Sequence, residues 1–137
     1  MSREEMLGAF STAHDNLLIA ADAAVTQGDL LEAPWGLREI LAHVAAWEAE
    51  GMYRIPLLDG GADGVGYDID AFNAAVAASV ANQSLGQVRA TLLDTHERLL
   101  SMLDDMDEVA FAPHGAAYEW VAALTAHSNE HAGELRR

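Results

Sequence analysis

The segment WGLREILAHVAAWE, residues 35–48, decides the fold. Its apolar side chains recur every three or four residues, which is the spacing of an amphipathic helix that buries one face. The apolar stripe begins at Leu37 and continues through Ile55 to Pro56, where a helix is expected to end. The segment therefore predicts a long helix with one buried face.

The same spacing predicts four further helices, one of them short. They are expected over about residues 3–25, 70–81, 84–103 and 116–137, and the second of these is the short one. The run DGGADGVG, residues 59–66, holds four glycines and is expected to be a loop, because glycine loses the most backbone entropy in a regular element.

Three polar residues are placed to cap these helices. Ser2 is followed three residues later by Glu5, and Ser84 by Gln87, which is the spacing of a capping box. Asp70 is expected to cap the short helix. These signals fix where three of the helices begin.

The order of these elements predicts an all-α protein. No segment shows the two-residue alternation of a half-buried strand. The link between the second and third long helices carries the glycine loop and the short helix, so it is long enough to cross the bundle. Residues 1–137 are therefore expected to form a single four-helix bundle domain with up-down-down-up topology.

The charge of the chain excludes two classes of partner. Asp and Glu number 22 against 7 Lys and Arg, which gives a net charge of −15, and all the cationic residues are arginines. Nucleic acids and anionic membrane surfaces need a basic footprint, so neither is expected to bind. The sequence shows no long apolar span and no secretory signal at Met1–Glu5, so a cytoplasmic location is expected.

The absence of cysteine restricts the chemistry further. A chain without cysteine has no disulfide, no thiolate zinc site and no thiol nucleophile of its own. Six histidines remain as candidate metal ligands. If the protein has a reactive site, histidines and carboxylates are expected to supply it.

Three histidines form the strongest candidate site. His127 and His131 are four residues apart, so on a helix both side chains can reach one ion. His43 lies at the margin of the apolar stripe of residues 35–56, where a bundle can bring it opposite that pair. Three imidazoles with one open position are typical of a catalytic zinc site. The alternative for the pair is a polar pair at a helix edge.

Four glutamates are near enough in sequence to orient these imidazoles. They are Glu39, Glu50, Glu130 and Glu134. Carboxylates of this kind often accept a hydrogen bond from a ligating histidine, although solvated surface charges are the alternative. The di-iron bundle is a rival reading, but it requires a Glu-x-x-His spacing that the chain lacks.

The remaining histidines are less promising as ligands. His14 and His96 each lie among apolar residues and are expected to be structural or boundary residues. His114 lies in a connection, and nothing in its spacing indicates a ligand.

The segment of residues 35–48 resembles the second helix of the DinB-like four-helix-bundle superfamily, in which a histidine precedes a Trp-Glu pair. Residues 126–131, AHSNEH, resemble the closing histidine pair of that superfamily, and Asp70–Asn73 after a glycine-rich crossover is similar as well. The likeness is closest to the branch with the ClbS/DfsB group and the mycothiol-dependent maleylpyruvate isomerase N-terminal domains. Gly36 departs from the pattern, because the family prefers serine or threonine there.

The resemblance implies a metal site of His43, His127 and His131 that holds zinc or nickel, in a bundle that often forms a homodimer. Members with known activity are largely transferases or isomerases that use low-molecular-weight thiols, together with some hydrolases and antibiotic self-resistance proteins. Because this chain has no cysteine, any thiol nucleophile must come from an external cofactor.

The sequence supports one leading hypothesis and two rivals. The leading one is a metal-dependent enzyme that activates either water or an external thiol against a small molecule, with Glu39, Trp47 and Trp120 around the metal and in the pocket wall. The first rival is a bundle that binds or sequesters a small molecule without catalysis, its metal structural or absent. The second is a plain dimerisation bundle, in which His43 and His127 lie far apart.

Overall fold

The structure is a computed structural model that describes residues 2–28, 36–57, 67–113 and 115–136. Within these ranges all regular structure is helical, which confirms the expected all-α class. The α-helices are α1 (Arg3–Thr26), α2 (Leu37–Arg54), α3 (Ile69–Ser79), α4 (Leu85–Asp104) and α5 (Ala116–Leu135), with short 3-10 helices at Ile55–Leu57 and Glu108–Phe111. The predicted glycine loop and His114 lie outside the described residues.

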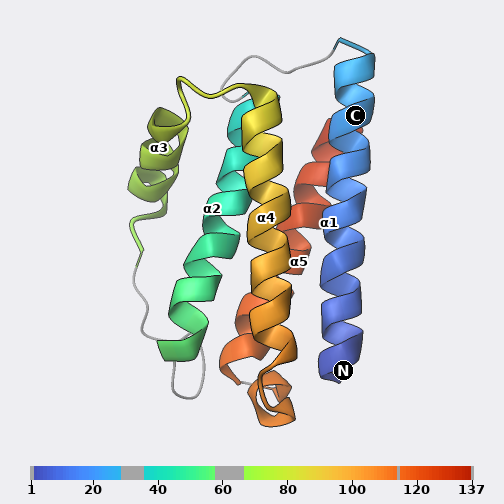
Figure 1. Cartoon of the computed structure of the whole chain (residues 1–137), viewed down its shortest axis with the longest axis vertical. Helices are drawn as coiled ribbons and strands as arrows, with labels where there is room; N and C mark the ends of the chain where they lie inside the picture. The colour runs from blue at the N-terminus through green and yellow to red at the C-terminus, as the bar shows by residue number, and fades with distance from the viewer. Residues whose placement is uncertain (1, 29–35, 58–66, 114, 137) are drawn as a thin grey trace.

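The four long helices form an up-down-down-up bundle, as predicted (Figure 1). The starts of α1 and α5 pack together in one apolar cluster, which includes Phe10 and Val121, so these two helices are parallel. The starts of α2 and α4 pack in the other cluster, which includes Leu41 and Leu92 together with the end of α1. The helix α3 lies beside α2, outside the bundle, on the crossover that joins α2 to α4.

Two serines cap two of the long helices, as predicted, but only the cap at Ser84 is a complete capping box. The Ser84 side chain accepts a hydrogen bond from Gln87 N–H, and the Gln87 side chain accepts one from Ser84 N–H, which completes a capping box. The Ser2 side chain accepts from Glu5 N–H at 3.1 Å. Its hydroxyl lies 3.2 Å from the Glu5 carboxylate. Each cap satisfies backbone groups that the first turn of a helix leaves without partners.

The cap of α3 differs from the prediction. The residue that caps it is Asp68, whose carboxylate accepts from Ala71 N–H at 3.1 Å, whereas Asp70 lies inside the first turn. Asp68 has the extended backbone that an N-cap needs, and a carboxylate in the first turn is also favourable beside the helix dipole. Two aspartates so close together leave the sequence signal ambiguous by two residues.

Buried polar side chains separate the two apolar clusters of the core. On each of the four bundle helices, at least one such residue comes between the residues of one cluster and those of the other. They are His14 on α1, Glu48 on α2, Thr95 and His96 on α4, and Ser128 and His131 on α5. The middle of the bundle is therefore polar, although the rest of its core is aliphatic and aromatic.

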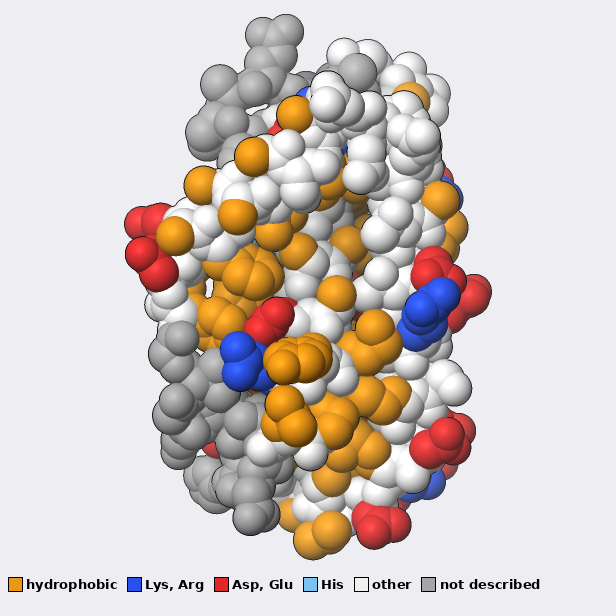
Figure 2. All heavy atoms as spheres, turned by 60° about the vertical axis from the view of Figure 1, so that its left-hand side comes forward, with side chains coloured by type: hydrophobic (Ala, Val, Ile, Leu, Met, Phe, Trp, Pro, Cys, Tyr) orange, Lys and Arg blue, Asp and Glu red, His pale blue; other side chains and the backbone are white. Residues whose placement is uncertain are grey.

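The surface around α3 is largely apolar. Figure 2 shows hydrophobic side chains gathered on this face, with few charged ones among them. A hollow of about 250 Å³ between α2, α3 and α4 has a described lining of small and aliphatic residues together with Gln83, and none of these side chains is titratable. Among the described helices, none has the length and hydropathy that crossing a membrane would require.

Candidate metal centre

The three predicted ligands meet between α2 and α5. His127 Nε2 lies 2.6 Å from His43 Nε2 and 3.0 Å from His131 Nε2. Because α2 and α5 run antiparallel, the first half of α2, which carries His43, lies beside the last half of α5, which carries the histidine pair. The four-residue spacing of His127 and His131 places both rings on one face of α5, where they meet edge to face. The structure thus brings together side chains that are 84 residues apart in the chain.

The local environment keeps two of these imidazoles, those of His43 and His127, neutral at pH 7. Burial, together with the nearby His131, lowers the pKa of His43 to about 4. Burial and the two neighbouring imidazoles lower the pKa of His127 to about 3. A histidine must be deprotonated at the nitrogen that binds a metal ion, so both rings are ready to act as ligands at neutral pH.

The arrangement fits a divalent metal ion. Ligands of tetrahedral zinc at roughly 2.0–2.1 Å from the ion are about 3.4 Å from each other. The His127–His43 pair of Nε2 atoms, at 2.6 Å, therefore needs to spread by about 0.8 Å, and the His127–His131 pair, at 3.0 Å, by about 0.4 Å. Three imidazoles suit zinc and nickel among other transition metals. His131 also has an outer partner, because its Nδ1 lies 2.9 Å from Glu134 Oε2. A carboxylate in that position fixes the ring and leaves Nε2 free to bind a metal.

The histidines lie in the wall of a large pocket. It has a volume of about 770 Å³, and the described part of its lining holds three aromatic residues, two glutamates and mostly apolar residues besides the histidines. The lining comprises His43, Trp47, Tyr67, Ile69, Asn73, Glu119, Trp120, Ala123, Leu124, Ala126, His127, Glu130 and His131. This volume is in the usual range for a small-molecule site.

Hydrogen bonds hold two of the aromatic rings in place. Trp47 Nε1 donates to Asn73 Oδ1 at 3.1 Å, which links α2 to α3 across the pocket. Tyr67 OH donates to Glu50 Oε1 at 2.7 Å. Burial and this hydrogen bond raise the pKa of Tyr67 to about 12, so its hydroxyl stays protonated. The aromatic wall is therefore ordered without a ligand.

The third ring, Trp120, depends on a glycine of α2. A Cβ atom added at Gly51 would lie 2.5 Å from Trp120 Nε1, so only glycine allows the indole to lie against this helix. We expect Gly51→Ala to displace Trp120, to destabilise the fold by about 1–3 kcal/mol, and to change the intrinsic fluorescence. Urea unfolding and emission spectra measure both effects.

Gly8→Ala is the matched control for Gly51→Ala. Gly8 lies on the exposed face of α1, and nothing lies within 4 Å of the position of its Cβ atom. Alanine there should stabilise the helix by up to about 1 kcal/mol, because it restricts the unfolded chain. If the two substitutions change the stability and the fluorescence equally, the close packing of Trp120 against Gly51 is not what makes Gly51→Ala destabilising.

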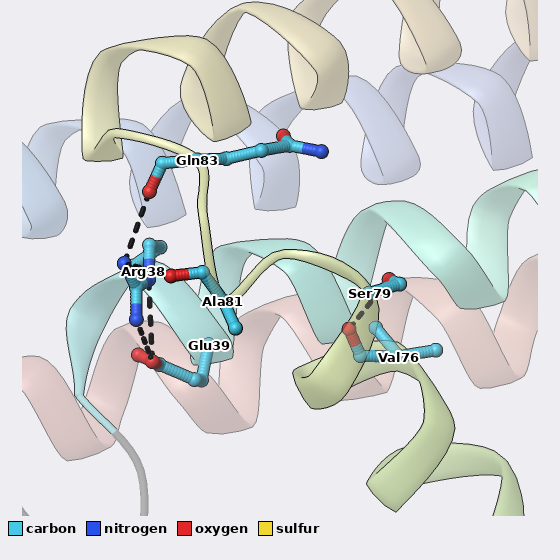
Figure 3. Close-up of polar contacts among 6 residues, drawn as sticks. All are labelled: Arg38, Glu39, Val76, Ser79, Ala81 and Gln83. Atoms are coloured by element: carbon cyan, nitrogen blue, oxygen red, sulfur yellow. Dashed lines mark hydrogen bonds and ion pairs between the residues drawn. The ribbon is translucent and has the colours of Figure 1, made fainter.

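The predicted pocket residues divide into two groups. Trp47 and Trp120 line the pocket with the histidines, whereas Glu39 is not among the described lining residues. Its carboxylate instead pairs with Arg38 at 2.7 Å, and that hydrogen bond holds the pKa of Glu39 below its usual value. Arg38 also donates to Gln83 O at 3.0 Å, so the pair ties α2 to the α3–α4 connection (Figure 3).

A second cluster of buried polar groups was not anticipated as a unit. His14, Glu48 and His96 each offer a ligand atom within 4.8 Å of the others. The sequence indicates that His14 and His96 are structural, and it does not single out Glu48 for any role. The helical spacing of α2 could have predicted that Glu48 is buried. Glu48 lies in the middle of the buried stripe of this helix, which consists of Leu37, Leu41, Val44, Glu48, Gly51 and Ile55.

Of the comparisons with known proteins, the one with protein families agrees with a histidine metal site. No curated protein and no solved structure matches the chain. The sequence model of the DinB superfamily matches residues 2–135, which is nearly the whole chain. Members of this superfamily often bind metal, and the three histidines of α2 and α5 are placed for that role. The chain belongs to the DinB superfamily.

Proposed function

We propose that the protein is a metal-dependent enzyme that activates a small nucleophile against a small molecule held in the aromatic pocket, with hydrolysis as its reaction. The observation that carries the proposal is the meeting of three imidazole Nε2 atoms in the wall of a cavity of about 770 Å³. Such a cavity gives a substrate room to approach the Nε2 atoms that would bind the metal ion.

His43, His127 and His131 would hold zinc or nickel. When bound, the ion would lower the pKa of a coordinated water or thiol to near neutrality and so supply a nucleophile. Glu134 would keep His131 in the orientation that ligation needs, through the hydrogen bond to Nδ1. The neutral state of His43 and His127 favours binding of a cation at pH 7.

The charge of the pocket favours water over a thiol cofactor as the nucleophile. Its described lining contains Glu119 and Glu130 but neither arginine nor lysine. A thiol cofactor that carries carboxylates would be repelled, whereas either glutamate can accept a proton from water. The same charges favour neutral or cationic substrates over anionic ones.

The aromatic side chains would supply the binding energy for the substrate. The Trp47 and Tyr67 rings meet edge to face at 5.1 Å, and their hydrogen bonds fix both of them before any ligand arrives. A flat apolar substrate, or a cation beside these faces, gains most from such a wall. A preordered site also avoids the entropic cost of ordering side chains on binding.

The proposal is tested with protein produced without a histidine tag. Metal content is measured first, and a panel of neutral and cationic esters and amides is then assayed with and without added thiols. We expect turnover that does not need a thiol, that a chelator abolishes, and that zinc or nickel restores. His127→Ala should have no such activity.

Two results would contradict the hydrolase. Turnover that requires a thiol would point to a thiol transferase. Tight binding of a panel compound without any turnover, in metal-loaded and metal-free protein alike, would favour the sequestration alternative. The size of the pocket and its mostly apolar lining are the observations that favour this alternative, because they suit the binding of a small molecule without catalysis.

A further inference from the structure

The polar cluster in the middle of the core is the feature that the proposed function leaves unused. His14, Glu48 and His96 come from α1, α2 and α4, and their exposed fractions are 3%, 0% and 4%. Because the Glu48 carboxyl is buried away from water, its pKa is raised above the usual value. The cluster is therefore enclosed by the bundle and does not belong to the open pocket of the histidine triad.

Each member of the cluster keeps a polar atom without a hydrogen-bond partner among the described residues. These atoms are His14 Nδ1, Glu48 Oε2 and His96 Nε2. A buried polar atom without a partner costs about 1–3 kcal/mol, and apolar side chains of similar volume would avoid that cost. A ligand that satisfies several of these atoms at once would remove much of the cost.

The side chains of the cluster are of the types that bind a metal ion. Two imidazoles and one carboxylate, each offering one atom within 4.8 Å of the others, match sets that bind zinc and iron in proteins. In the metal-free arrangement a hydrogen bond of 2.8 Å joins Glu48 Oε1 to His96 Nδ1, and an ion bound to these two atoms would replace it. A carboxylate in the set would also compensate part of the charge of a divalent ion.

We propose that His14, Glu48 and His96 form a second site for a divalent transition-metal ion, enclosed in the bundle core and separate from the histidine triad. In the metal-free arrangement the His14 and His96 rings are stacked, with centroids 3.6 Å apart and planes 4° from parallel. The lone pairs of parallel rings do not meet at one point. Binding therefore requires one ring to turn out of the stack.

The enclosure of the site predicts slow exchange. An ion can reach a cluster this deeply buried only when the bundle opens locally, whereas the triad lies in the wall of an open pocket. The protein unfolded and refolded with Zn²⁺ should hold two equivalents of metal. A chelator should remove one of them quickly and the other slowly.

Variants assign the slow equivalent to the core. His127→Ala, refolded with Zn²⁺ or Co²⁺, should keep about one slowly exchanging equivalent, and Glu48→Gln in the same background should lose it, with at least a tenfold drop in retained metal. Glu134→Gln in that background is the control and should keep the metal. Should Glu48→Gln fail to fold, His14→Leu removes a ligand with an apolar side chain instead.

Two outcomes would overturn the second site. One is a His127→Ala protein that folds but retains no metal after refolding. The other is a slow equivalent that survives both Glu48→Gln and His14→Leu. Either result would leave His14, Glu48 and His96 as a hydrogen-bonded core cluster only. Because the readout is metal retention in a protein without the triad, it does not depend on whether the pocket catalyses hydrolysis.

Discussion

Replacing His127 with alanine should weaken binding of the rapidly exchanging metal ion at least about a hundredfold. His127 is the central member of the triad, with its Nε2 within 3.0 Å of the Nε2 atoms of both His43 and His131. Loss of an outer partner of a ligand already costs roughly 10–100-fold in metal affinity, so loss of a ligand should cost at least as much. Competition with a chromophoric chelator measures the change.

Two glutamates of α5 extend this prediction into a graded series. Glu134→Gln should weaken metal binding about 10–100-fold, because it replaces the carboxylate that lies 2.9 Å from His131 Nδ1. Glu130→Gln is the matched control, since it removes the same charge one turn earlier on an exposed part of the helix. It should change the affinity by less than about threefold, as expected for a solvated charge.

The series separates orientation of the ligand from long-range charge. If Glu130→Gln and Glu134→Gln weaken binding equally, attraction by the acidic surface explains both effects, and Glu134 does not position His131. If His127→Ala leaves the affinity of the fast equivalent unchanged, the triad is not the metal site. Circular dichroism of each variant checks that the bundle is intact.

The sequence predicted the bundle well because its helices carry local signals. The apolar stripe of α2, the capping box at Ser84 and the long crossover each depend on residues near one another in the chain. The topology followed from the length of that crossover, which allows α2 and α4 to be parallel. The cap of α3 was placed two residues too late, because Asp68 and Asp70 give the same local signal.

Only those parts of the site that depend on spacing within one helix could be predicted from the sequence. His127 and His131 share one face of one helix, so their pairing could be predicted from their spacing. The contact of Glu48 with His96 joins residues 48 positions apart on two helices, and local periodicity does not encode which buried residues meet. Glu39 shows the same limit, because its partner is the adjacent Arg38 and it is not among the described pocket residues.

Acid should destabilise the metal-free protein through His14. Burial, together with the nearby His96 and Arg89, lowers the pKa of His14 to about 4. In the unfolded chain this imidazole takes up a proton below about pH 6.5, whereas in the folded protein it does so only near pH 4. The free energy of unfolding should therefore fall as the pH drops from 6.5 to 4, and His14 should account for about 3 kcal/mol of the loss by pH 4.

The other titrating groups set the background of this measurement. His43 and His127, whose pKa values are also lowered, add acid sensitivity of the same sign. Glu48 acts in the opposite direction, because burial raises its pKa and the folded state then takes up its proton more readily than the unfolded chain does. The contribution of His14 is therefore measured as a difference between two proteins at each pH.

His14→Leu isolates that contribution, because it removes the titrating ring and leaves an apolar side chain beside the core. Urea unfolding of both proteins in the presence of a chelator, from pH 7.5 to pH 4, gives the difference in unfolding free energy. We expect this difference to shift in favour of the variant by about 3 kcal/mol over that range, whatever its value at pH 7.5. A difference that stays constant with pH would mean that His14 takes up its proton as readily in the folded bundle as in the unfolded chain. The stacked and buried ring would then have to be reached by water, against the enclosure on which the core site depends.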